Sequence, residues 1–244
     1  MNNRIIFTLL NIIIIWAFSS NSVTAGFQDI VKSAQKAFTA SDSLSESEII
    51  EGLKQALEIG SADAVELVSQ KGGYYDNAAI KIPLPESVQK VEKLLRSTGF
   101  GPKVDAFELS MNQAAEKAAP EAKSIFWDAI KKMEITDAKK ILNGRDDEAT
   151  LFFKDKTNDQ LQQIFKPIVE DSMAEVGVTR TYQELNDKMK SIPFADSMSF
   201  DLDQYVTDGS LDGLFKMLAE EEKKIRTEPA ARVTDLLKKV FADN

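Results

Sequence analysis

The stretch SESEIIEGLKQALEIG, residues 45–60, decides the fold class of this chain. Ser45 is followed three residues later by Glu48, which is the capping-box pattern of a helix start. Gly60 and Ser61 then predict a break or restart of the helix. Between these signals, apolar residues recur at the spacing of one helix face: Ile49, Ile50, Leu53, Ala56 and Leu57. The stretch therefore predicts an amphipathic α-helix that packs on a core.

Helical patterns of this kind continue toward the C-terminus. Residues 157–160 and 181–184 repeat the capping box, so each is expected to open a new helix. Pro167 lies inside one of these patterns and should kink or split that helix.

Strand signals are nearly absent. Period-two alternation is confined to AAIKIPL, residues 78–84, which is short and contains proline. We therefore predict a single compact all-α domain of roughly ten helices with short loops over residues 44–244. A helical arm over residues 26–43 precedes it, and a terminal helix is expected over residues 229–241.

One segment interrupts the helices: KGGYYDNAAIKIPLPESV, residues 71–88. Gly72 is suited to the left-handed conformation that ends a helix, and the prolines hold their predecessors extended. This interpretation describes a hinge and leaves two large amphipathic rings, Tyr74 and Tyr75, without a role. Together with Asn77 they form our first candidate surface for a partner or ligand.

The N-terminus has the pattern of a cleaved signal peptide. Arg4 precedes an apolar run over residues 5–18, and small residues at Val23 and Ala25 predict cleavage after Ala25. A retained membrane anchor is the alternative, although the run is shorter than the ~20 residues of a spanning helix. Because the chain has no cysteine, a lipid anchor is excluded, and we expect a periplasmic or secreted protein.

The composition excludes several chemistries. With 0 cysteines and 0 histidines, the chain has no thiol nucleophile, no Ser-His-Asp triad and no Cys/His zinc site. The formal net charge of −9 argues against nucleic acid as a partner. No cofactor is expected, and any metal site must use oxygen ligands.

An acidic stretch, DLDQYVTDGSLDG at residues 201–213, suggests a calcium loop. An EF-hand loop needs a small polar ligand at its fifth position and glycine at its sixth, where this chain has Tyr205 and Val206. Calcium is therefore only a weak interpretation of three acidic side chains: Asp201, Asp203 and Asp208.

A second candidate surface lies in NGRDDEATLFF, residues 143–153. Asn143, Arg145 and Asp147 cluster at a helix start, where free N–H groups attract anions. The simpler interpretation is a capped helix junction in which Arg145 pairs with a neighbouring carboxylate. As a further alternative, Thr150, Phe152 and Phe153 could line a pocket. Phe152 and Phe153 are adjacent and point in different directions on a helix, so only one of them can face the centre of a core.

The charged run AEEEKKIR, residues 219–226, has i,i+4 spacing between Glu220 and Lys224 and between Glu222 and Arg226. Mixed charge at this spacing is typical of a solvated helix face.

A series of motifs covers nearly all of residues 44–241 in order: LSESEIIEGLKQAL, KGGYYDNAAIKIPLPESVQKVEKLLR, VDAFELSMNQAAEKAAPEAK, DAKKILNG, FKPIV, DLDQYVTDGSLDGLF and EEEKKIRTEPAAR. In these motifs the chain resembles a bacterial family, the domain of unknown function 4197. The resemblance implies an exported helical protein of Gram-negative bacteria with no assigned activity. Gln113 stands where similar sequences tend to have arginine, which weakens the case for an anion site there.

Two functional hypotheses follow from these observations. The first is a non-catalytic binding or protein-interaction module whose partner is a protein or a small apolar ligand of the cell envelope. The 14 phenylalanines, the missing catalytic residues and the signal pattern favour it. The second is a carboxylate-dependent hydrolase acting on cell-envelope glycan, for which no catalytic residue is singled out.

Overall fold

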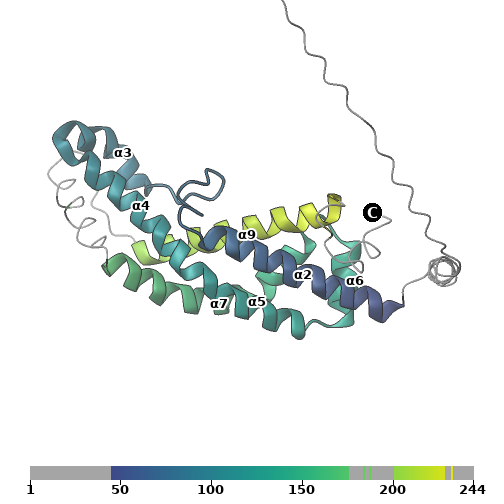
Figure 1. Ribbon diagram of the computed structural model, residues 1–244. Coiled ribbons are helices and arrows are strands. Elements are labelled where there is room, and N and C mark those ends of the chain that lie inside the picture. Colours follow the sequence, from purple (N-terminus) through teal and green to yellow (C-terminus); the bar gives the residue numbers. More distant parts are fainter. Residues whose placement is uncertain (1–44, 176–183, 185–186, 188–200, 229–231, 233–244) are drawn as a thin grey trace, which may run out of the picture. The chain divides into compact units, whose positions relative to one another are not determined.

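The computed structural model describes residues 45–175, 184, 187, 201–228 and 232 (Figure 1). Within them the chain forms helices α2 (Glu46–Ser69), α3 (Glu86–Leu95), α4 (Gly101–Ala118), α5 (Ala122–Lys131), α6 (Ile135–Asn143), α7 (Glu148–Glu175) and α9 (Leu202–Thr227). A π-helical turn, η1 (Arg96–Phe100), joins α3 to α4, and a 3₁₀ turn, η2 (Ala119–Glu121), joins α4 to α5. The described residues contain no strand, so the all-α class is confirmed.

The described residues hold fewer helices than the roughly ten expected. The predicted signal peptide, the arm, the helix start at Thr181 and the terminal helix lie outside them. Within them, the predicted breaks at Gly60 and Thr157 are absent, and each absence has a physical reason. None of the helices in these ranges is long and apolar enough to span a membrane.

The first absent break is at Gly60. The capping box is confirmed, because Ser45 accepts a hydrogen bond from the Glu48 amide and Glu48 accepts one from the Ser45 amide. However, α2 continues through Gly60 to Ser69. A Cβ at Gly60 would lie 3.1 Å from Cδ1 of Ile225, so the missing side chain lets α9 approach α2 closely. Helix packing thus outweighs the low helix propensity of glycine.

The second absent break is at Thr157. This residue lies inside α7 and is buried, and its hydroxyl donates to the Phe153 carbonyl at 2.6 Å instead of capping a new helix. A threonine that bonds back to the preceding turn can sit inside a helix without ending it. Pro167 also lies inside α7 and does not split it.

The long helices enclose one hydrophobic core. Helix α9 packs on α2, α4 and α7, and α5 packs on α2 and α7. The ring centroids of Phe126 and Phe153 are 4.8 Å apart, and those of Phe126 and Phe215 are 6.2 Å apart. As expected for adjacent phenylalanines on a helix, Phe153 is fully buried whereas Phe152 is only partly buried.

The connection over residues 70–85 is built into the core. Tyr74 is completely buried, and its hydroxyl donates to the Ser210 carbonyl at 2.6 Å. The amides of Tyr74 and Tyr75 both donate to Oε1 of the buried Glu116, at 3.2 and 3.4 Å. Gly72 has a φ of 82°, which confirms the predicted left-handed turn.

Asn112 of α4 holds the second half of this connection. Its Oδ1 accepts from the Ile82 amide at 2.8 Å, and its Nδ2 donates to the Ile82 carbonyl at 2.9 Å. The Tyr205 hydroxyl of α9 donates to the Pro83 carbonyl at 3.1 Å. The connection is therefore fixed to both α4 and α9.

Candidate functional site

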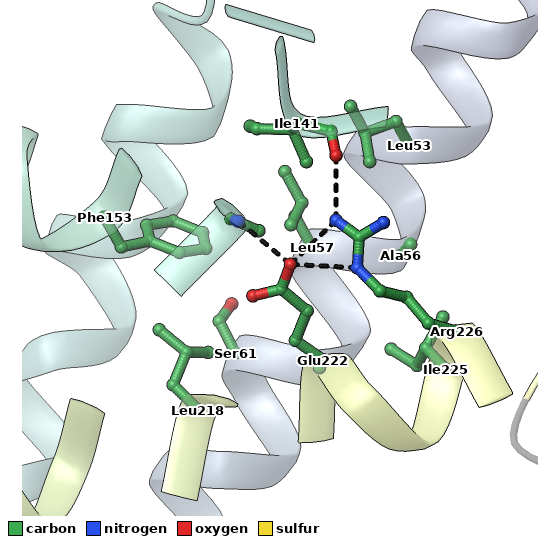
Figure 2. Close-up of a pocket in the computed structure, with 12 residues that line it drawn as sticks. Leu53, Ala56, Leu57, Ser61, Ile141, Phe153, Leu218, Glu222, Ile225 and Arg226 are labelled. Atoms are coloured by element: carbon green, nitrogen blue, oxygen red, sulfur yellow. Dashed lines mark hydrogen bonds and ion pairs between the residues drawn. The ribbon is translucent and has the colours of Figure 1, made fainter. Parts of the chain in front are cut away.

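The described helices enclose two hollows of interest. One lies among α2, α6, α7 and α9 and contains a buried carboxylate, Glu222 (Figure 2). The other is a groove between α5 and α7, bordered by α6.

Glu222 occupies the N-terminus of α7. Its Oε1 accepts from the Ala149 amide at 2.9 Å, and its Oε2 accepts from both the amide and the hydroxyl of Thr150, each at 2.9 Å. Arg226 donates to Oε1 from Nε and Nη2, at 3.1 and 2.8 Å. The same Nη2 reaches the Ile141 carbonyl at 2.8 Å, so the two side chains join α9 to α6 and α7 (Figure 2).

This arrangement satisfies Glu222 completely. A carboxylate offers about four lone-pair sites, and Glu222 accepts five hydrogen bonds from three residues. It also neutralises the partial positive charge at a helix N-terminus, where the first amides lack helical partners. The cavity beside it measures about 20 Å³, which is room for one water molecule. The cluster is therefore a structural joint with no free acceptor for acid–base chemistry.

The sequence-based interpretation of residues 219–226 as a solvated face is wrong for this pair. The Glu222 and Arg226 side chains are only 7% and 10% exposed. The predicted Glu220–Lys224 pair is replaced by an ion pair between Lys224 and Glu221 at 2.6 Å. The local charge pattern could not reveal this, because the burial comes from α7, which is more than seventy residues away in sequence.

The first candidate surface is largely internal. Tyr74 lies in the core, as described above, and Tyr75 is half-buried beneath the Lys81 ammonium, 4.2 Å from its ring centroid. Asn77 closes a side-chain turn by accepting from the Ala79 amide at 3.0 Å. Its Nδ2 contacts the Met217 sulfur at 3.6 Å.

The second candidate surface forms the α6–α7 junction. Asn143 donates from Nδ2 to the Lys139 carbonyl at 2.8 Å, and Arg145 pairs with Asp147 at 3.3 Å, both exposed. Gly144 is extended, and a Cβ there would lie 2.3 Å from Cγ of Glu148. This matches the simpler interpretation of a capped junction with a locally paired arginine. No hydrogen bond or ion pair among the described residues joins it to the first surface.

The three acidic side chains considered for calcium have separate roles. Asp201 caps α9 by accepting from the Gln204 amide at 2.9 Å and pairs with Lys166 at 3.2 Å. Asp208 accepts from the side chains of Gln162 and Gln204, at 2.9 and 2.8 Å. Over the described part of the chain, no three acidic side chains gather in a way that would hold a metal ion.

Asp203 leads to a prediction about pH. Burial raises the pKa of Asp203, and the charges of Glu170 and Asp201 raise it further against the opposing Lys166. The folded state therefore binds a proton more readily than the unfolded state, and the charged form destabilises the fold at neutral pH. We expect Asp203→Asn to increase the free energy of unfolding at pH 7 by less than about 1 kcal/mol. The gain should vanish below the ordinary Asp pKa of 3.8.

Urea unfolding at pH 7 and pH 3.5 measures this gain. Asp159→Asn is the matched control, since Asp159 is exposed on α7. A gain that persists unchanged at pH 3.5 contradicts the proposed cause.

The groove between α5 and α7 has an apolar floor. Ile125 and Ala129 of α5 and Phe152 of α7 line it, with the buried Thr157 beside them. The groove is open to the surface, and its volume is about 150 Å³. Phe152 lines this groove, Phe153 lines the hollow beside Glu222, and Thr150 lines neither, so the three residues do not line one pocket together.

Charged side chains of both signs border this groove. Asp128 and Lys132 stand on the α5 side, and Lys156 stands on the α7 side near Asp137 of α6. Lys156 pairs with Asp155 at 3.1 Å, and this hydrogen bond raises the pKa of Lys156. The sequence alone did not predict the groove, because its two walls belong to different helices, α5 and α7. Only tertiary packing brings these two helices together.

The chain was compared with curated proteins, solved structures and protein families. No curated protein and no solved structure matches the chain. The sequence profile of a family described as "Protein of unknown function (DUF4197)" matches residues 43–242. That range covers most of the chain, including every described helix. The chain therefore belongs to the DUF4197 family.

Proposed function

We propose that this protein is an exported, non-catalytic binding module of the cell envelope, and that the α5–α7 groove receives an apolar group of its ligand. The observation that carries the proposal is the groove itself, with its volume of about 150 Å³, apolar floor and charged border. Ligand sites in proteins commonly combine an apolar lining with a few polar groups that orient the ligand. Export rests on the signal pattern of residues 1–25.

Binding is favoured over hydrolysis by the state of the carboxylates. A glycan hydrolase needs two facing carboxyl groups, one of them with a raised pKa. Among the described residues, a raised carboxyl pKa is resolved at Asp63 on α2 and Asp203 on α9. Neither of them borders the groove, and the buried Glu222 is fully occupied by structural hydrogen bonds. No observation on these residues favours the hydrolase.

Benzyl alcohol is a suitable neutral probe of the groove, because its ring matches the apolar floor. In amide-resolved NMR titrations we expect saturable shifts confined to α5, α6 and α7, with a Kd in the millimolar range, about −4 kcal/mol. Ala129→Leu fills the floor and should abolish these shifts while the protein remains folded.

Ser124→Leu is the matched control for this experiment. It adds the same side chain to α5 at an exposed position that does not line the groove, so binding should be retained. Shifts spread over the whole surface, or shifts unchanged in Ala129→Leu, would overturn the proposal.

A further inference from the structure

We propose that the α5–α7 groove binds the zwitterionic backbone and the side chain of an apolar amino acid. This inference rests on the proposed binding function and names its ligand class.

The spacing of Asp128 and Lys132 matches the two charges of an α-amino acid. Asp128 lies in the last turn of α5, and Lys132 is the residue that caps the C-terminus of this helix. The Lys132 amide still donates to the Asp128 carbonyl at 3.2 Å, so the i,i+4 spacing holds and the two Cβ atoms lie about 6 Å apart. In an amino acid, one carbon atom carries both the ammonium and the carboxylate. An ammonium beside Asp128 and a carboxylate beside Lys132 therefore place that carbon at the α5 wall of the groove, which Ala129 also lines.

Both side chains have capacity for a ligand. No hydrogen bond or ion pair engages the Lys132 ammonium within the described ranges. Asp128 has one distant partner, the Lys131 ammonium at 3.9 Å, and that lysine also lies over the Trp127 ring. At 61% side-chain exposure, Asp128 can accept a second cation without desolvation.

The floor selects the size of the ligand side chain. With the α-carbon at this wall, a side chain directed toward α7 meets Ile125 and Phe152. The volume of about 150 Å³ is sufficient for one leucine or phenylalanine side chain. Aromatic rings also gain from an edge or offset contact with Phe152.

The balance of charge distinguishes this ligand from simple anions and cations. Two carboxylates, Asp128 and Asp137, and two ammonium groups, Lys132 and Lys156, line the groove. A singly charged ligand therefore meets as much repulsion as attraction, whereas a zwitterion can place each of its charges beside an opposite one.

A ligand series tests the inference. L-Phenylalanine carries both charges, 2-phenylethylamine lacks the carboxylate, 3-phenylpropionate lacks the ammonium, and benzyl alcohol carries neither. We expect L-phenylalanine to bind most tightly in NMR titrations, and each missing charge to weaken binding about two- to fivefold, as for exposed ion pairs.

Two variants assign the charges to side chains. Lys132→Gln should weaken L-phenylalanine and 3-phenylpropionate about two- to fivefold and leave 2-phenylethylamine unchanged. Asp128→Asn should weaken L-phenylalanine and 2-phenylethylamine and leave 3-phenylpropionate unchanged. Lys123→Gln and Asp159→Asn are the matched controls, because both side chains are exposed, lie outside the groove and form no ion pair with Asp128 or Lys132. All four positions are exposed, so the variants should fold.

The outcomes separate this inference from the binding function. If all four probes bind equally and the variants change nothing, the amino-acid inference is overturned and the apolar groove stands. If 3-phenylpropionate or 2-phenylethylamine binds most tightly, the zwitterion is overturned in favour of a singly charged ligand. If no probe binds, including benzyl alcohol, both proposals fail.

Discussion

Replacing Glu222 with alanine is expected to lower the free energy of unfolding by about 3–5 kcal/mol, the usual cost of removing one partner of a buried ion pair. Four groups lose an acceptor in this variant, one of them the Thr150 hydroxyl. The Arg226 guanidinium, only 10% exposed, retains the Ile141 carbonyl alone among the partners described above. The amides of Ala149 and Thr150 lose their hydrogen bonds at the start of α7.

Glu220→Ala is the matched control, since Glu220 is exposed two residues away on the same helix. It should change stability by no more than about 0.5 kcal/mol. Glu222→Gln keeps the shape but loses the charge and two acceptor positions, so its effect should fall between these values. Urea unfolding followed by circular dichroism measures all three. If Glu222→Ala is as stable as Glu220→Ala, the hydrogen bonds of Glu222 do not stabilise the packing of α9 on α6 and α7.

Replacing Tyr74 with alanine is expected to cost about 3–5 kcal/mol, as for other buried aromatic side chains. The ring fills space against α9 so closely that a Cβ on Gly213 would lie 2.5 Å from its Cε1. The variant also leaves the Ser210 carbonyl without the tyrosine hydroxyl. Burial raises the pKa of Tyr74, which keeps this hydroxyl protonated as a donor.

Tyr75 is the natural control for Tyr74. It is the next residue and has the same side chain, but it is only half-buried, with the Lys81 ammonium over its ring. We expect Tyr75→Ala to cost about 1 kcal/mol or less, because it leaves the Glu116 hydrogen bond to the main chain intact. Thermal and urea unfolding of the two variants provide the comparison. Equal losses would contradict the assignment of Tyr74 alone to the core.

Local sequence signals predicted the local structure well. The capping box at Ser45, the left-handed turn at Gly72 and the alternation of Phe152 and Phe153 are each decided within a few residues. The energies involved come from backbone conformation and neighbouring hydrogen bonds, which a sequence window contains. The same signals failed where another helix decided the outcome, as at Gly60 beneath Ile225.

The candidate site was harder to predict for the same reason. Glu222 and Arg226 have the spacing of an ordinary surface pair, and only the placement of α6 and α7 buries them. The groove combines α5 with α7, and neither helix alone indicates that a hollow lies between them. Residues within one helix could be grouped by periodicity, whereas residues from two helices required the packed structure.

The burial of Tyr74 also determines when this domain can fold during synthesis. The Tyr74 hydroxyl donates to the carbonyl of Ser210, which lies 136 residues later in the sequence. Asn77 likewise contacts Met217, which lies 140 residues after it. A nascent chain that ends before α9 has therefore produced the ring but not the wall that encloses it. The domain therefore completes its fold only after α9 has been synthesised, and contacts this distant in sequence form slowly.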